Sequence, residues 1–285
     1  MIPQNNTTVY ISDLDGTLLR NDATISPWSR EKLTELLDEG INFTIASARS
    51  ANSIKQILGP LPLTLPVIEI NGAFITDYHT YKHLVINEME KDLLDGIYDC
   101  IRRNKFDHFV STFNGTEDCL YYRNLSNPGL QWYHDNRVEC GDRRLRPTKS
   151  IRDSFSDSVV AFTVIDTFQR LQLLDEQLRE KFDGQLETHF FENIYSPPWW
   201  WLTIHDKKAC KSIAVKELCE ITGFSEKDTV IFGDNLNDIK MFEASSQAVA
   251  VANAIDDVKR HANEVIGSNE DDSVVKYISN HSRNF

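Results

Sequence analysis

The sequence predicts an α/β protein in which a doubly wound parallel sheet is interrupted by an inserted α+β domain. Short β-prone runs alternate with helical segments over roughly the first third of the chain, and the same alternation returns from residue 211 onward. Strand–helix–strand units at this spacing form right-handed crossovers and parallel strands. The segment between these two parts lacks this regular alternation and is dense in aromatic residues. We therefore expect one domain from residues 1–85 and 193–285, and an inserted domain from residues 86–192.

The N-terminal part supplies the first strands and helices of the expected sheet. Ser26 before Pro27 is typical of an N-cap followed by proline at the first helical position, and Gly40 ends that helix. The expected elements are strand 8–12, helix 27–39, strand 41–46, helix 51–58 and strand 66–70.

The inserted part predicts a sheet with helices on one side. Its expected elements are helix 87–103, strands 109–113 and 119–122, helix 129–136, an irregular basic stretch at 141–152, strand 159–165, helix 168–182, and strands 186–191 and 199–204. The C-terminal part returns to strand–helix units. There we expect helix 211–220, strand 229–232, helix 239–244, strand 248–251, helix 255–261 and strand 265–266.

The charge of the chain restricts its partners. A formal net charge of −13 argues against a nucleic-acid or anionic-membrane surface, which carries a basic footprint. An anionic small substrate remains compatible, because a metal ion and a few lysines can invert the local field.

The cysteines and the apolar runs bear on location. The five cysteines include no C-x-x-C pair, so neither a disulfide framework nor a zinc site is expected. The start, 1–8, is polar and does not resemble a signal peptide, and no apolar run approaches the ~20 residues that cross a bilayer. We expect a cytoplasmic protein.

The first acidic cluster stands at the end of the first expected strand, where residues 13–17 read Asp-Leu-Asp-Gly-Thr. Ligands of doubly wound sheets bind at the carboxyl ends of strands, so these side chains face a site. Asp13 and Asp15 would point the same way in a strand, but Gly16 predicts a turn that redirects the second. One carboxylate can then attack while the other transfers protons. For this run alone, a simple turn or helix cap is the alternative.

The second acidic cluster, Gly-Asp-Asn-Leu-Asn-Asp at 233–238, follows the expected strand 229–232. Carboxylates gathered at neighbouring strand ends repel one another unless a cation lies between them. Carboxylate oxygens with open positions for water and phosphate suit Mg²⁺. A turn with an N-cap is again the alternative, but two acidic strand ends in one chain favour a metal site.

Two further residues complete a candidate phosphate site. Ser47 follows strand 41–46 and opens a loop into a helix, where its hydroxyl and nearby N–H groups can hold a phosphate oxygen. Lys211 begins a helix after the insertion and can neutralise charge that develops during transfer. Each alone is also compatible with an ordinary surface residue.

These four pieces, in this order, resemble the four motifs of the haloacid dehalogenase superfamily. The long insertion between the second and third resembles the large-cap, Cof-type branch (class IIB) of sugar-phosphate phosphatases. The resemblance covers nearly the whole chain, since the turn Asn-Gly-Ala at 71–73 and the segment 248–254 also resemble that branch. It implies a Rossmann-like core and a cap domain that reads the substrate.

The resemblance also implies roles. Asp13 would form an aspartyl-phosphate, and Asp15 would protonate the leaving alcohol and then activate water. Mg²⁺ would be held by Asp13, the backbone carbonyl of Asp15, and Asp234, with Asp238 as a ligand or a supporting residue.

The phosphoryl group would be held by Ser47 and Lys211, with Asn237 in support. The expected substrate contacts are Arg49, Asn71, Arg143 and Arg144. Two departures from the family pattern bear on these roles. Ser47 stands where Thr is more usual, which keeps the hydroxyl, and Lys207 and Lys208 lie close enough to Lys211 to compete for its role.

The run Pro-Pro-Trp-Trp-Trp at 197–201 stands out in the insertion. In a strand, Trp199 and Trp201 share one face and Trp200 takes the other. Core packing of the inserted domain is the favoured interpretation, and stacking on a sugar ring is the alternative.

The sequence therefore predicts a Mg²⁺-dependent phosphatase that acts on small phosphomonoesters. A phosphomutase and a non-catalytic relative are the alternatives, because the motifs leading to an aspartyl-phosphate are shared. The sequence does not identify the substrate: hexose and pentose phosphates, a flavin nucleotide and pyridoxal phosphate all remain open.

Overall fold

The computed structural model describes residues 7–192 and 196–284, which form two compact units. The first, here the core unit, comprises the chain up to Val85 together with Cys210 onward; the second, here the inserted unit, is Ile86–Ala209. The expected second boundary, at residue 193, falls on a segment outside the described residues. It is wrong for the described residues that follow, because the strand Trp200–Asp206 pairs within the sheet of the inserted unit.

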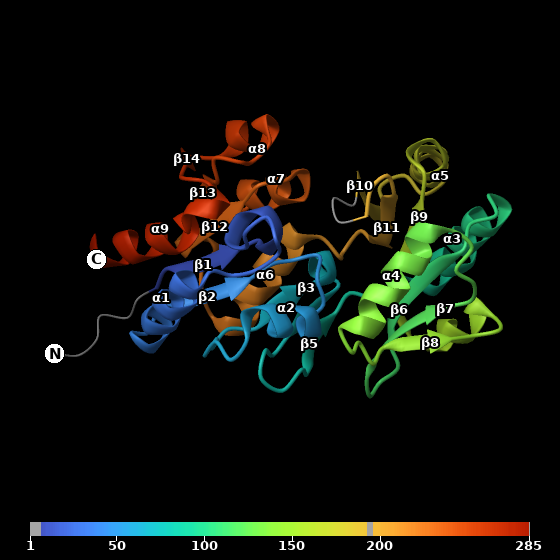
Figure 1. Ribbon diagram of the computed structural model, residues 1–285, viewed down its shortest axis with the longest axis horizontal. Helices are drawn as coiled ribbons and strands as arrows, with labels where there is room; N and C mark the ends of the chain where they lie inside the picture. Colours follow the sequence, from blue (N-terminus) through green and yellow to red (C-terminus); the bar gives the residue numbers. More distant parts are fainter. Residues whose placement is uncertain (1–6, 193–195, 285) are drawn as a thin grey trace. The chain divides into compact units, whose positions relative to one another are not determined.

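The core unit is built on a five-stranded parallel sheet of order β14-β13-β12-β1-β2 (Figure 1). Its strands are β1 Val9–Ser12, β2 Asn42–Ile45, β12 Thr229–Gly233, β13 Gln247–Ala250 and β14 Glu264–Val265. The chain leaves β1 toward β2 on one side, while β12, β13 and β14 lie on the other. The strand order therefore reverses between β1 and β12, the position where doubly wound sheets bind ligands.

Six helices accompany this sheet in the described residues. They are α1 Pro27–Asp38, α2 Ala51–Leu58, α6 Lys211–Thr222, α7 Leu236–Glu243, α8 Asp256–His261 and α9 Ser273–His281. Ser26 accepts a hydrogen bond from the Ser29 backbone N–H, as expected for an N-cap. All four residues of β1 are buried, as in a parallel strand covered on both faces.

Three core elements were not predicted. β4 (Phe74–Thr76) and β5 (His83–Ile86) join β3 (Val67–Glu69) in a small sheet, in which β3 and β4 run antiparallel. Helix α9 follows the last strand, and its Val275 and Ile278 lie in the core. The two strands are too short to show a period-2 pattern of their own.

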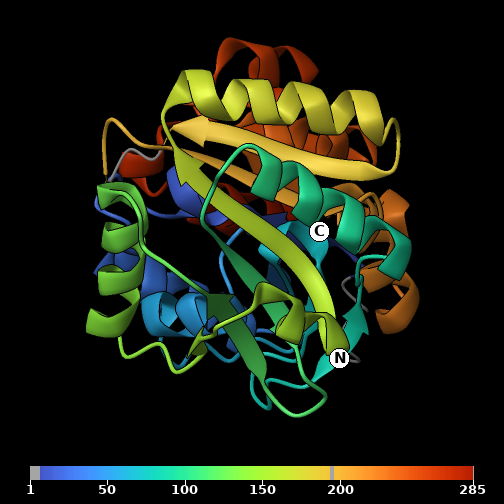
Figure 2. The same cartoon turned by 90° about the vertical axis from the view of Figure 1, so that its right-hand side faces the viewer.

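The inserted unit has a six-stranded sheet of order β10-β11-β9-β6-β7-β8 (Figure 2). Its strands are β6 His108–Phe113, β7 Asp118–Tyr122, β8 Leu145–Pro147, β9 Ser158–Asp166, β10 Leu186–Glu192 and β11 Trp200–Asp206. Neighbours pair antiparallel except β7 and β8, which are parallel. β8 lies in the stretch expected to be irregular.

Helices cover both faces of this sheet, which corrects the expectation of helices on one side. Helices α3 (Lys91–Arg103) and α5 (Phe168–Lys181) pack on one face through a cluster that includes Ile97 and Leu174. Helix α4 (Pro128–Glu139) packs on the other through Leu130 and Tyr133. A separate cluster of buried side chains therefore forms on each face.

The tryptophan run packs within the inserted unit on both faces. Trp201 meets the ring of Tyr133 edge-on at 4.8 Å, and Trp199 packs with the same cluster. Trp200 contacts Phe168 and Phe190, at 4.8 Å and 5.1 Å between ring centroids. These contacts agree with the favoured interpretation of core packing. Within the described residues, no helix is long and apolar enough to cross a membrane.

Candidate active site

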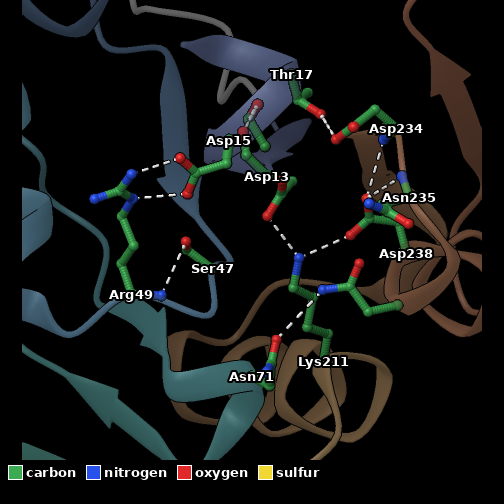
Figure 3. A network of polar contacts seen from close by, with 12 residues as sticks. Asp13, Asp15, Thr17, Ser47, Arg49, Asn71, Lys211, Asp234, Asn235 and Asp238 are labelled. Atoms are coloured by element: carbon green, nitrogen blue, oxygen red, sulfur yellow. Dashed lines mark hydrogen bonds and ion pairs between the residues drawn. The ribbon is translucent and has the colours of Figure 1, made fainter. Parts of the chain in front are cut away.

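Asp13 and Asp15 follow β1 on a turn that sends their side chains in different directions (Figure 3). Asp13 keeps an extended backbone, while Gly16 has a φ of 77°. A Cβ at Gly16 would lie 2.5 Å from Asp234 Oδ2, so glycine is required both by the turn and by the neighbouring carboxylate. The Asp13 side chain points to Lys211, and that of Asp15 points to Arg49.

Lys211 joins the two acidic clusters. Its Nζ donates to Asp13 Oδ1 at 2.6 Å and to Asp238 Oδ1 at 2.7 Å, and the lysine is only 1% exposed (Figure 3). Asp238 Oδ2 in turn accepts the backbone N–H groups of Asp234 at 3.0 Å and Asn235 at 3.1 Å. The ammonium and the start of α7 therefore use both oxygens of Asp238.

Burial and mutual repulsion shift the pKa values of this cluster. Burial, opposed in part by Lys211, raises the pKa of Asp13 well above its ordinary value. Burial and the nearby Asp238 raise the pKa of Asp234 to about 7. Burial lowers the pKa of Lys211, but the Asp13 and Asp238 carboxylates outweigh this and raise it above its ordinary value. Lys211 is therefore an ammonium at neutral pH.

The cluster fits a divalent cation. One oxygen from each of Asp13, Asp234 and Asp238 lies within 4.8 Å of the others. The hydrogen bonds to Asp13 and Asp234 fall on Oδ1, from Lys211 and from Thr17. Buried carboxylates whose protonation is favoured by repulsion gain most from a cation, and hard oxygen donors suit Mg²⁺. Since both Asp238 oxygens are engaged, Asp13 and Asp234 are the better candidate ligands, with Asp238 holding them in place.

Ser47 lies in a loop that β2 and the small sheet hold from two sides. Its side chain is buried, and its Oγ accepts the Arg49 backbone N–H at 3.2 Å. The N–H groups of Asn71 and Ile70 donate to the carbonyls of Ser47 at 2.9 Å and Arg49 at 3.1 Å. Ile70 and Asn71 adopt positive φ angles of 49° and 56°. Such an angle is unusual for Ile70, which is β-branched. The strained turn therefore fixes the loop that carries Ser47.

Two of the expected site residues contact each other beside this loop. Asn237, in the first turn of α7, donates from Nδ2 to Asn71 Oδ1 at 3.3 Å. Arg49, which is expected to contact substrate, binds Asp15 with two hydrogen bonds, Nε to Oδ2 at 2.7 Å and Nη2 to Oδ1 at 2.6 Å. The core unit thus brings together all the expected catalytic, metal and phosphate residues.

Comparison with known proteins identifies the family. The family of haloacid dehalogenase-like hydrolases matches residues 10–278. The chain belongs to this family. It is similar to pyridoxal phosphate phosphatase YbhA of Escherichia coli, with 27% identity over 96% of this chain and 98% of the relative. It is also similar to 5-amino-6-(5-phospho-D-ribitylamino)uracil phosphatase YitU of Bacillus subtilis, with 24% identity over 93% of this chain and 94% of the relative.

A solved structure extends the comparison to the whole fold. A sugar phosphatase of haloacid dehalogenase subclass IIB superposes with a TM-score of 0.73 at 17% identity, covering 96% of this chain and 99% of that one. The comparisons confirm the predicted family, the predicted fold class and the predicted enzyme class, phosphoric monoester hydrolase.

Two polar residues of this haloacid dehalogenase-like hydrolase were not singled out from its sequence. Thr17 Oγ1 donates to Asp234 Oδ1 at 2.7 Å. Asn253 Nδ2 donates to the Gly16 carbonyl at 2.7 Å, and its Oδ1 accepts the backbone N–H of Asn269 at 2.9 Å. Thr17 and Asn253 lie inside sequence segments that resemble the family, and that resemblance is the signal that could have identified them.

Arg143 and Arg144 lie in the inserted unit. Arg144 pairs with Asp142, with Nε–Oδ1 and Nη2–Oδ2 distances of 2.9 and 2.7 Å, and this pair is largely buried. Although burial lowers it, the Asp142 carboxylate raises the pKa of Arg144 above its ordinary value. Because Asp142 neutralises its charge, the Arg144 guanidinium stabilises its own loop. Arg143 is exposed, with no such partner among the interactions described.

Proposed function

We propose that this hydrolase is a Mg²⁺-dependent phosphatase of small phosphomonoesters and that Asp13 is its nucleophile. The observation that carries the proposal is the buried Asp13–Lys211–Asp238 arrangement at the strand-order reversal, with Asp234 beside it. Buried ion pairs at such a position indicate a catalytic site, because a buried ion pair adds little to the stability of a fold.

The chemistry proceeds in two steps. Asp13 attacks phosphorus, so that a bond from its carboxylate oxygen forms while the bond to the ester oxygen breaks, and Asp15 gives its proton to the leaving alcohol. A water molecule then attacks the phosphorus of the aspartyl-phosphate and gives a proton to Asp15. Inorganic phosphate leaves, and the Asp13 carboxylate is restored.

The remaining residues bind and orient. Mg²⁺, held by Asp13, Asp234 and the backbone carbonyl of Asp15, would supply positive charge to the phosphoryl oxygens. Lys211 and Ser47 would bind the same group, and Asn237 would support it from α7. Because Lys211 already spans Asp13 and Asp238, its ammonium is positioned before substrate arrives, which lowers the reorganisation cost.

The substrate class is a small phosphorylated metabolite. The two relatives are named for pyridoxal phosphate and for a phosphoribityl-aminouracil, each a phosphomonoester of a primary alcohol. We propose that the inserted unit contributes the contacts that select the alcohol. A cytoplasmic location is part of the proposal. It is supported by the five cysteines, which are free thiols. The acidic net charge suits a protein that does not bind nucleic acid.

The test is release of inorganic phosphate from pyridoxal 5′-phosphate, ribose 5-phosphate, glucose 6-phosphate and flavin mononucleotide with Mg²⁺. We expect wild type to release phosphate from at least one, and EDTA or Asp13→Asn to abolish release. Asp38→Asn, the same change at an exposed carboxylate of α1, is the matched control and should retain activity. No release from any ester, or transfer to a second hydroxyl instead of to water, would contradict the proposed phosphatase. Retained activity in Asp13→Asn would refute the nucleophile.

A further inference from the structure

Arg49 and Asp15 form a bidentate ion pair in the candidate site. Both guanidinium nitrogens that face Asp15 bond to separate carboxylate oxygens, at 2.7 Å and 2.6 Å (Figure 3). The side chains of Arg49 and Asp15 are 25% and 38% exposed, so the pair is half-buried. A bidentate pair of this kind fixes the plane of the carboxylate as well as its position.

Arg49 is itself anchored at several points. Its backbone N–H donates to Ser47 Oγ and its carbonyl accepts the Ile70 N–H, while Nη1 lies 3.4 Å from Ser53 Oγ at the start of α2. Asp15 lies on a turn just before Gly16, whose φ is 77°. A carboxylate at such a turn has rotamer freedom to lose, and the guanidinium fork removes it.

We infer that Arg49 is a positioning residue: one bond of its fork keeps the Asp15 carboxyl oriented, while the other Asp15 oxygen, which carries the proton taken from water in the preceding turnover, donates it to the leaving alcohol. The inference rests on the proposed function and replaces the expected role of Arg49 as a substrate contact. A guanidinium that already neutralises one carboxylate attracts a phosphate only weakly. Ser47 and the unshared ammonium hydrogen of Lys211 remain for the phosphoryl group.

The chemistry of the leaving group provides the test. An alkoxide leaves poorly without a proton, whereas p-nitrophenolate leaves readily without one. The value of kcat/KM covers the steps through transfer to Asp13, so it reports protonation of the leaving group and not hydrolysis of the aspartyl-phosphate. A residue that acts through Asp15 therefore matters for alkyl phosphates and little for p-nitrophenyl phosphate.

For Arg49→Gln we expect kcat/KM to fall ~10–100-fold with the best alkyl phosphate of the panel and less than ~3-fold with p-nitrophenyl phosphate. Asp15→Asn should give the same pattern more strongly, and Arg49→Gln added to Asp15→Asn should lower kcat/KM no further. Arg49→Lys keeps the charge but loses the fork, so it should retain the defect with the alkyl phosphate. Equal losses with both esters, or additive losses in the double variant, would overturn the inference.

Arg30→Gln is the matched control, because Arg30 is also a half-buried arginine of the core unit and its guanidinium binds the carbonyls of Ile57 and Leu58, away from the carboxylates of the site. It should leave the ratio of the two kcat/KM values unchanged. If wild type releases no phosphate from either ester, the proposed function fails. If wild type is active and Asp13→Asn is not, but Arg49→Gln affects both esters alike, only the role of Arg49 fails.

Discussion

The two units of this chain treat buried charge differently. In the core unit, Lys211 pairs with Asp13 and Asp238, and none of these three side chains is more than 9% exposed. In the inserted unit, the buried carboxylates Asp166 and Asp175 pair with α5 arginines whose side chains are 48% and 61% exposed.

The buried histidines of the inserted unit complete the contrast. Burial lowers the pKa values of His108 and His205 to about 4, so both are neutral at physiological pH. Removing charges from water costs several kcal/mol for each ion, so a fold retains them where chemistry uses them. The core unit bears that cost for a lysine that is fully buried, whereas the arginines that pair with Asp142, Asp166 and Asp175 in the inserted unit keep 16% to 61% of their side chains exposed. The catalytic charges are thus assigned to the core unit by their energetics as well as by their position.

The largest effect should come from removing the central cation of the core unit. In Lys211→Met, Asp13 and Asp238 lose their shared partner and the phosphoryl group loses a positive charge, so kcat should fall ~10²–10³-fold. Lys207→Met changes an exposed lysine of the inserted unit and is the matched control for the choice of lysine. Phosphate release under saturating substrate measures both, and a larger loss in Lys207→Met would reverse the assignment.

In the inserted unit, a comparable change should affect stability and not catalysis. Trp201 packs on Tyr133, so Trp201→Ala should lower the free energy of unfolding by about 3 kcal/mol. Urea titration measures this change. A raised KM with unchanged stability would instead show that the ring stacks on substrate, and the contrast between the units would weaken.

A smaller effect is expected at the turn that carries Asp15. Asn253→Ala removes the hydrogen bond to the Gly16 carbonyl, so the turn should loosen and kcat should fall about 10-fold with KM nearly constant. Asn280→Ala, at an exposed position of α9, is the control. A change in KM alone would indicate that Asn253 contacts substrate and does not support the turn.

The smallest effect concerns pH. The pKa of Asp234 is about 7 in the folded chain and near 3.8 when unfolded, so the folded state favours the protonated form. Its contribution to the stability of the metal-free protein is present below pH ~4 and is lost as pH rises through about 7. Mg²⁺ should therefore raise the melting temperature ~3 °C more at pH 8 than at pH 5. In Asp234→Asn this difference should disappear; its persistence would place the ion elsewhere.

The sequence predicts the scaffold better than the contacts within it. Alternating strands and helices, with Ser26 and Gly40 at helix ends, sufficed for most elements, because capping and periodicity are local. The strand Phe74–Thr76 was missed because three residues carry no periodic signal. The boundary after residue 192 was misplaced because pairing of β11 with β9 is a long-range property.

The site shows the same division. Runs of residue types indicated that Asp13, Asp234 and Lys211 belong together, because strand ends of a parallel sheet meet at one edge. No pattern in the sequence specifies that Lys211 spans two carboxylates, or that Arg49 turns toward Asp15. Those contacts depend on side-chain rotamers chosen among many, and only the assembled loops select them.

The position of β1 between β2 and β12 has a consequence for folding during synthesis on the ribosome. When residue 209 has been added, the whole inserted unit has been synthesised, but β1 still lacks one of its two neighbours. Domains generally fold as units during synthesis, so we expect the insertion to fold while the rest of the chain waits for its last quarter. A nascent chain stopped there would carry Asp13 and Asp15 without Lys211 or Asp234, so the enzyme becomes active only near the end of its own translation.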